Sequence, residues 1–271
     1  MEPGNQSTSF RKDIEGLRAI CIIAVVCYHA VASIAPGGFV GVDIFFVISG
    51  FVITRLLLTE YHSSGNINLV KFVGRRIRRI LPIATLVLIC TAIAVLWFHK
   101  LDARAISQHF VAAALFYHNI HQARIAVDYL GGNHLDNPTL HFWSLAVEEQ
   151  FYLIWPLMLV CILRALNWLN PDRRRFMLLL VIAVFWMGSF AYSVYMTNVF
   201  TTWAFFDPFS RSYQLLSGAF LAAMAQGGSD RPNIMLSNVL GFVAFSCIII
   251  SFAALSSRNL YPGFAALLPT G

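Results

Sequence analysis

Long apolar runs are the feature of this sequence that most restricts its fold. Several approach the ~20 residues that a helix needs to cross the hydrocarbon core of a bilayer. Of the 271 residues, 58% are hydrophobic and only 12% are charged, whereas a soluble domain carries roughly 25% charged residues. We therefore predict an all-α, polytopic transmembrane helical bundle that forms a single domain over residues 1–271.

Seven segments are predicted to span the membrane: residues 17–35, 39–59, 80–98, 141–163, 176–196, 208–226 and 236–256. A further apolar piece, residues 110–120, is too short and is predicted to be re-entrant or interfacial. Cytoplasmic loops carry an excess of Lys and Arg. With a cytoplasmic N-terminus, fourteen of the 19 Lys and Arg residues lie inside, whereas an eighth span would leave twelve inside. The seven-span topology is the better prediction.

Composition argues against two other classes of site. The net charge of +6 comes from basic residues in the predicted loops, where topology explains them, so no nucleic-acid partner is indicated. The five cysteines lie in apolar segments without a Cys-x-x-Cys pair, which indicates neither a disulfide framework nor a zinc site. His118 and His121 are three positions apart, but nothing nearby completes a ligand set, and we predict no metal site.

The first predicted span carries a cation and a titratable base on one helical face. Arg18 and His29 are eleven positions apart, which is about three turns and roughly 16 Å along a helix. We predict that His29 lies deep in the span, where a titratable side chain is costly and indicates function. A neutral imidazole there acts as a general base or as an acyl acceptor. The alternative is a histidine that only packs against a neighbouring helix.

A polar stripe follows one face of the fourth predicted span: His141, Ser144, Glu148 and Tyr152. These residues are three or four positions apart and so share a face. Glu148 is predicted to reach the depth of His29, orient its imidazole and stabilise the imidazolium. Glu149 is rotated by about 100° and is predicted to matter less. The alternative for the stripe is hydrogen bonding between helices without a catalytic role.

Asp43 begins the second predicted span, in the segment GFVGVDIFFVISGFVITR. We predict that Asp43 lies beside His29 across the short turn between the first two spans. Gly41 and Gly50 in the same segment permit close helix approach. The alternative for Asp43 is capping of the helix N-terminus, where acidic residues are favoured.

Four arginines form a basic face at the inner end of the third predicted span: Arg75, Arg76, Arg78 and Arg79. Guanidinium groups bind diphosphate and phosphate oxygens bidentately, which predicts a binding site for a polyanionic cosubstrate. The alternatives are positive-inside anchoring and contact with anionic lipids.

Five segments together resemble the acyltransferase-3 family of integral membrane acyltransferases, in particular the bacterial branch that O-acetylates cell-surface glycans. They are residues 13–29, 38–54, 75–82, 137–156 and 210–222. The family pattern of Arg and His eleven residues apart is matched by Arg18 and His29. Its Arg-x-x-Arg is matched by Arg75 with Arg78 and by Arg76 with Arg79, and its Ser-Leu-x-Val-Glu and Gly-x-Asp-x-Phe-Phe motifs are matched at 144–148 and 41–46.

The resemblance implies transfer of an acyl group, usually acetyl, from cytosolic acyl-CoA to a hydroxyl of a cell-envelope glycan or lipid-linked glycan on the outer face. Acetyl-CoA would be a cosubstrate, and no permanently bound cofactor is expected. The implied location is the bacterial cytoplasmic (inner) membrane, with the N-terminus in the cytoplasm and lipids around the bundle. The catalytic candidates are His29, Glu148, Arg18 and Asp43, and the donor is expected at the four arginines.

Two departures from the family pattern qualify the resemblance. Tyr213 and Gln214 stand where members commonly carry an acid after an aromatic residue. Members also continue into further spans, and many append a soluble esterase-like domain, so we expect this chain to be a truncated product or a fragment.

The main alternative function is a transporter or flippase with an intramembrane His–Glu proton relay. The sequence shows no inverted repeats and no Gly/Pro-interrupted segments in matching halves, which counts against it. A purely structural scaffold does not explain four polar constellations at membrane depth.

Overall fold

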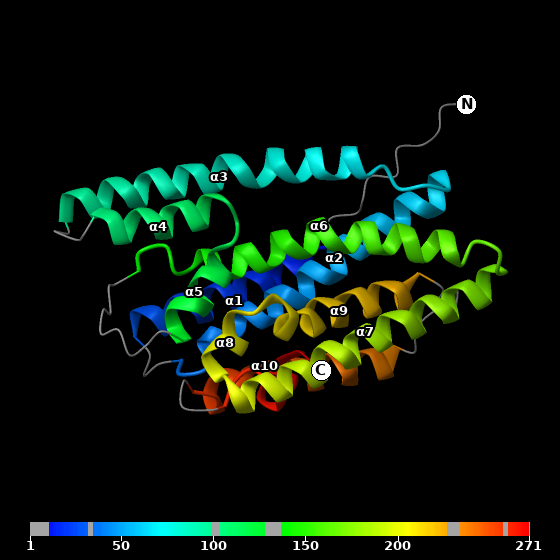
Figure 1. Cartoon of the computed structure of the whole chain (residues 1–271). Coiled ribbons are helices and arrows are strands. Elements are labelled where there is room, and N and C mark those ends of the chain that lie inside the picture. Colours follow the sequence, from blue (N-terminus) through cyan, green and yellow to red (C-terminus); the bar gives the residue numbers. More distant parts are fainter. Residues whose placement is uncertain are drawn as a thin grey trace.

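The computed structural model describes residues 11–31, 35–98, 103–127, 137–226, 234–256 and 260–270, and this part of the chain contains helices and no strand. The helices are α1 (Lys12–Ala30), α2 (Gly41–Ser64), α3 (Leu69–Phe98), α4 (Ala103–Ala114), α5 (His118–Val127), α6 (Phe142–Ala165), α7 (Pro171–Val199), α8 (Thr201–Phe206), α9 (Pro208–Ala225), α10 (Ile234–Ala254) and α11 (Leu267–Thr270). The long helices run side by side, and the short helices α4, α5 and α8 gather at one end of the bundle (Figure 1).

Within the described part of the chain, five helices are long and apolar enough to cross a membrane: Gly38–Ser64, Leu69–Trp97, Phe142–Ala165, Pro171–Val199 and Ile234–Ala254. The prediction of an all-α, polytopic membrane protein is therefore confirmed. The other two predicted spans, 17–35 and 208–226, correspond to α1 and α9. Helix α1 begins with several charged residues and α9 carries a buried arginine, so neither is as apolar as the five. The count of seven spans stays a prediction.

The apolar piece at 110–120 belongs to two short helices. Helices α4 and α5 have 12 and 10 residues, and the chain turns between them at Phe116, whose φ is 54°. The polar stretch 121–140 begins inside α5, and residues 128–136 lie outside the described part. Both helices are too short to cross a bilayer, and their re-entrant or interfacial position stays a prediction.

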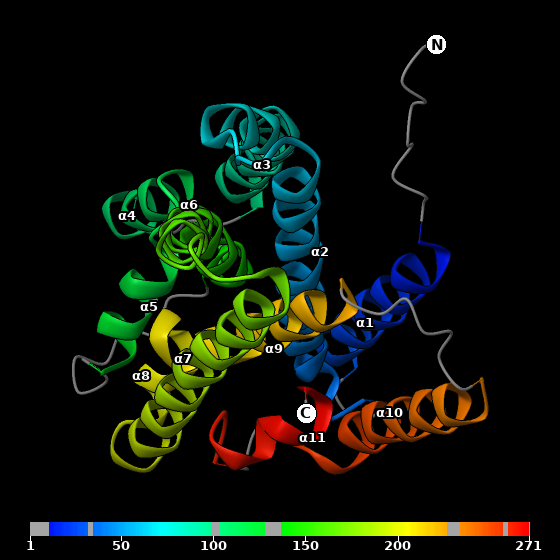
Figure 2. The same cartoon turned by 90° about the vertical axis from the view of Figure 1, so that its right-hand side faces the viewer.

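The core lies where α2, α6, α7 and α9 meet. Phe46, Leu57, Trp155, Ile182 and Leu215 are fully or almost fully buried there. The indole N–H of Trp155 donates to the Thr54 hydroxyl at 2.8 Å and so joins α6 to α2 inside the core. Seen along the bundle, α1 and α10 lie on one side of α2 and α9, and α3, α4 and α6 lie on the other (Figure 2).

Two glycines allow α2 and α9 to cross at backbone contact. A Cβ added at Gly50 would collide with the carbonyl oxygen of Leu215, and one added at Gly218 would collide with that of Val47. Small residues permit this close approach in membrane bundles. The expectation that Gly50 permits close packing is confirmed, and its partner glycine lies on a helix far along the chain.

Replacing Gly50 with alanine should push α2 away from α9. Overpacking of this kind costs about 1–3 kcal/mol, so Gly50→Ala should lower the melting temperature in detergent. Gly188→Ala is the matched control, because Gly188 also lies within a long helix and a Cβ there meets nothing within 4 Å. If Gly50→Ala and Gly188→Ala have the same melting temperature, the close crossing of α2 and α9 at Gly50 is wrong.

Candidate active site

A buried ion pair joins α2 to α9. The Arg211 guanidinium donates to Asp43 Oδ1 at 2.6 Å, and the two side chains are 1% and 2% exposed. Arg211 Nε also donates to the carbonyl oxygen of Phe205 at 2.8 Å. The second carboxylate oxygen of Asp43 accepts a hydrogen bond from the Tyr261 hydroxyl. Asp43 therefore links α2, α9 and the segment just before α11.

Three aromatic rings surround the Arg211 guanidinium. Its central carbon lies 4.7 Å from the ring centre of Phe205, 5.3 Å from that of Tyr261 and 5.5 Å from that of Trp143. Such cation–π contacts compensate part of the cost of burying a cation. All three rings also line the cavity described next, so the ion pair holds one wall of it.

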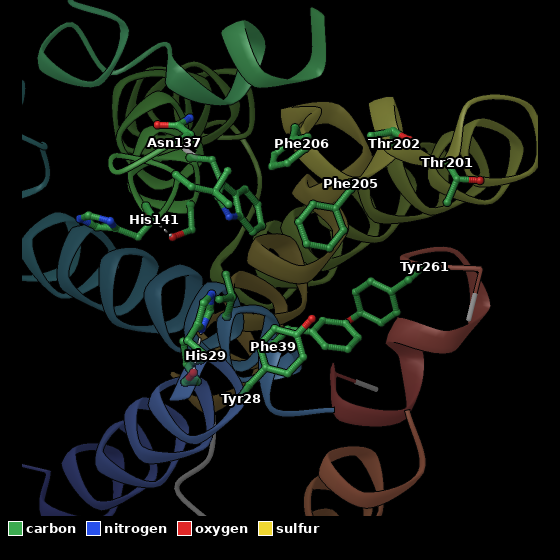
Figure 3. Close-up of a pocket in the computed structure, with 15 residues that line it drawn as sticks. Tyr28, His29, Phe39, Asn137, His141, Thr201, Thr202, Phe205, Phe206 and Tyr261 are labelled. Carbon is green, nitrogen blue, oxygen red and sulfur yellow. Dashed lines mark hydrogen bonds between the residues drawn. The ribbon is translucent and has the colours of Figure 1, made fainter. Parts of the chain in front are cut away.

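The histidine pocket is a cavity of about 670 Å³ enclosed by α1, α2, α6, α8 and the segment before α11. Its aromatic lining residues are Tyr28, Phe39, Trp143, Phe205, Phe206 and Tyr261. Its polar lining includes His29, Asn137, His141 and Ser144. Figure 3 shows the two imidazoles at one end of the pocket and Tyr261 at the other.

His29 lies in the last turn of α1, because the helix ends at Ala30 rather than at residue 35. Its Nδ1 lies 2.8 Å from the carbonyl oxygen of Val25. A carbonyl only accepts, so Nδ1 carries the proton and Nε2 keeps a free lone pair. No contact between Asp43 and His29 is found among the described residues, and the carboxylate of Asp43 is bonded to Arg211 and Tyr261 instead.

The arginine hollow, a second cavity of about 460 Å³, lies between α1, α2, α3 and α6. Arg18, Arg76 and Arg79 line it together with Glu148 and Tyr152. Tyr152 donates to Glu148 Oε2 at 3.2 Å, and the Arg76 guanidinium lies over the Tyr152 ring at 5.0 Å. The sequence predicted Arg18 as a catalytic residue, separate from the four donor arginines, and the structure places Arg18 in one cavity with Arg76 and Arg79.

Glu148 does not orient His29 in this structure. Its carboxylate forms hydrogen bonds with Ser49 of α2 and with Tyr152 of its own helix. It lines the arginine hollow rather than the histidine pocket. Glu148 was assigned to His29 because the two were predicted to lie at the same depth in the membrane. Equal depth does not determine which neighbouring helix a side chain faces. Glu149 lines neither cavity, and its Oε1 is buried without a hydrogen-bond partner.

The four-arginine cluster divides between two directions. Arg76 and Arg79 face the arginine hollow. Arg75 forms an ion pair with Glu60 of α2 at 3.4 Å, and Arg78 is exposed. The divergence follows from the helix: all four residues lie within α3, where neighbours along the chain are rotated by about 100°.

The apolar hollow, of about 330 Å³, lies between α3 and α6 and adjoins the other two cavities. It shares Arg79, Ile80 and Leu145 with the arginine hollow. It shares His141 with the histidine pocket. A series of adjoining cavities therefore leads along α3 and α6 from the arginines to the two histidines.

Three histidines of α4 and α5 lie close together near the histidine pocket. The rings of His109, His118 and His121 have centres 5.0–6.0 Å apart. Burial lowers the pKa of His118 to about 4, so the ring is neutral, and its Nε2 lies 3.2 Å from the amide nitrogen of Asn137. Within the described ranges, no group of three or more His, Cys, Asp or Glu side chains is arranged to hold a metal ion.

These features define a helical membrane domain with a basic cavity toward one end and an aromatic, histidine-bearing pocket toward the other. The acyltransferase domain family (Acyl_transf_3) matches residues 11–270, and the chain belongs to this acyltransferase-3 family. No solved structure matches.

Several curated relatives share a third of their aligned residues with this chain. The peptidoglycan O-acetyltransferase OatA of Listeria monocytogenes is 32% identical over 277 residues, which cover 97% of this chain and 43% of the relative. The O-acetyltransferase OatA of Staphylococcus aureus is 34% identical over 260 residues, which cover 93% of this chain and 42% of the relative. The putative peptidoglycan O-acetyltransferase YrhL of Bacillus subtilis is 32% identical over 243 residues, which cover 88% of this chain and 38% of the relative. The chain thus spans less than half the length of these relatives.

Breaking the Asp43–Arg211 pair from one side should destabilise the protein strongly. Asp43→Ala leaves Arg211 buried without its counter-charge, which typically costs about 3–5 kcal/mol, so the melting temperature should fall. Adding Arg211→Leu should recover part of that loss. Asp13→Ala, which breaks the exposed pair with Arg11, is the control and should cost at most about 1 kcal/mol. A double variant less stable than Asp43→Ala alone would show that the aromatic cage, not the charge pair, carries the stability.

Proposed function

We propose that this domain catalyses O-acyl transfer, moving an acetyl group from acetyl-CoA to a hydroxyl of a cell-envelope glycan. The observation that supports it is the series of cavities joining Arg18, Arg76 and Arg79 to His29. The names of the relatives suggest peptidoglycan as the acceptor. In this proposal the arginine hollow faces the cytoplasm and the histidine pocket faces the outside of the cytoplasmic membrane.

The arginine hollow suits the anionic part of the donor. Arg18, Arg76 and Arg79 present guanidinium groups to one cavity, and such groups bind diphosphate oxygens bidentately. Glu148 lies beside these arginines, and its proposed role is to hold Arg18 and Arg76 in place when the donor is absent. The long, uncharged arm of acyl-CoA then extends into the apolar hollow, whose walls include Ile83, Ala84 and Val87.

The histidine pocket suits an acceptor with alternating polar and apolar faces. Aromatic rings present flat apolar surfaces, and sugar rings carry one apolar face between their hydroxyl groups. His29 Nε2 has a free lone pair in this pocket, so it can take the proton from an acceptor hydroxyl. The hydroxyl oxygen bonds to the thioester carbon, the carbon–sulfur bond breaks, and the proton passes from His29 to the departing thiolate.

A second route uses the same nitrogen as a nucleophile. His29 Nε2 would accept the acetyl group from the thioester and pass it to the acceptor hydroxyl. Both routes exchange a thioester for an ester without a change in oxidation state, so the proposal includes no permanently bound cofactor.

Replacing His29 should abolish transfer without loss of the protein. Since a general base contributes typically 10²–10⁴-fold, His29→Ala should reduce acetylation by at least about 100-fold. Labelled acetyl-CoA and a soluble N-acetylglucosamine oligomer, added to membranes containing the protein, measure this. His62→Ala, in the last turn of α2, is the matched control. Near-normal transfer by His29→Ala would remove His29 from the mechanism, and transport of an unmodified oligomer without labelling would favour a transporter instead.

The arginines that face the hollow should matter more for the donor than those that do not. Replacing Arg76 and Arg79 with glutamine removes charged hydrogen bonds worth about 1.5–3 kcal/mol each, so the KM for acetyl-CoA should rise at least about 10-fold. The Arg75→Gln/Arg78→Gln protein has the same charge and should show a smaller rise. Equal effects of the two pairs on KM would indicate a general electrostatic or topological role.

A further inference from the structure

His141 occupies the junction between the apolar hollow and the histidine pocket. It immediately precedes α6 and is the one residue common to the described linings of both cavities. Figure 3 shows its ring at the same end of the pocket as His29, approaching from a different helix. A thioester that arrives along the apolar hollow therefore meets His141 before it reaches the aromatic part of the pocket.

The ring nitrogens of His141 have no hydrogen-bond partner among the described residues. The contact recorded for its ring is with Phe142, at 4.7 Å between ring centres. Its backbone is held instead, because the Ser144 hydroxyl donates to the His141 carbonyl oxygen at 3.3 Å. Neutral imidazole, the main form near pH 7 given the ordinary pKa of histidine, always offers one N–H donor.

Several other donors of the pocket already have partners within the protein. The Thr201 hydroxyl donates to the Thr197 carbonyl oxygen at 2.7 Å, and the Tyr261 hydroxyl donates to Asp43. The Asn137 amide is engaged with His118. The ring N–H of His29 donates to the Val25 carbonyl oxygen. The reaction needs a donor aimed at the oxygen where negative charge develops, and His29 supplies only a base.

Resting on the proposed acetyl transfer, we propose that His141 is a catalytic residue whose ring N–H donates to the thioester carbonyl oxygen. When the acceptor oxygen bonds to the carbonyl carbon, the carbonyl π electrons move onto this oxygen, and the His141 N–H stabilises the resulting oxyanion. On collapse the carbon–oxygen double bond re-forms and the carbon–sulfur bond breaks. His141 keeps its proton throughout, and the acceptor's proton travels through His29 to the thiolate.

The test compares His141→Gln with His141→Leu. Glutamine keeps an N–H donor of similar reach, whereas leucine fills similar space without one. Removing one oxyanion donor costs about 10²–10³ in kcat, so His141→Leu should lose at least about 100-fold in kcat with little change in the KM for acetyl-CoA. His141→Gln should stay within about 10-fold of the wild type. Melting temperatures of both variants check that the fold is retained.

Three results would overturn the assignment. Wild-type kcat in His141→Leu would show that His141 takes no part. A kcat in His141→Gln as low as in His141→Leu would assign a proton-transfer role that glutamine cannot perform. A parallel fall in the melting temperature, with a raised KM, would assign a structural role. If the wild-type protein transfers no label from acetyl-CoA, the proposed function is wrong. If the wild type transfers label but the variants give one of these three results, only the assignment of His141 is wrong.

Discussion

The Asp43–Arg211 ion pair is the interaction on which the histidine pocket depends. It is almost fully buried, joins α2 to α9 and accepts the Tyr261 hydroxyl as a third member. Burying two charges carries a large desolvation cost, which is repaid only when hydrogen bonds satisfy the remaining groups. Here the backbone of Phe205 and a cage of three rings supply those contacts. The same rings form the pocket wall, so the charge pair fixes the shape of the cavity that His29 faces.

Chemical character changes stepwise along the adjoining cavities. The arginine hollow brings three arginines together with Glu15 and Glu148. The apolar hollow has almost no polar lining apart from its two ends, and the histidine pocket combines aromatic walls with two imidazoles. In the proposed reaction the arginine hollow binds the phosphates of acyl-CoA and the apolar hollow binds its uncharged arm. The histidine pocket receives the thioester and the acceptor. The glycine crossing brings α2 and α9 to backbone contact. The same two helices carry Asp43 and Arg211, which form the buried ion pair.

Helical spacing relates to where several of these groups lie along the bundle. The eleven-residue interval of Arg18 and His29 places one at the arginine hollow and the other at the histidine pocket, and the polar stripe of α6 reaches both cavities. Pairings between distant helices were not accessible in this way. Asp43 and Arg211 are 168 positions apart, and Tyr261 is 218 positions from Asp43. Glu148 was assigned to His29 from depth alone, and depth does not determine which neighbour a helix face meets.

The sidedness of the donor tests the central claim most directly. Labelled acetyl-CoA is supplied either outside or inside sealed, inverted membrane vesicles that contain the protein, with an N-acetylglucosamine oligomer on the opposite side. If acetyl groups pass from the arginine hollow to the histidine pocket, label reaches the oligomer in the lumen when acetyl-CoA is on the outer, originally cytoplasmic, surface. The reverse arrangement then gives no labelling. Equal labelling from both arrangements, or labelling only when donor and acceptor share one side, would contradict transfer along the adjoining cavities.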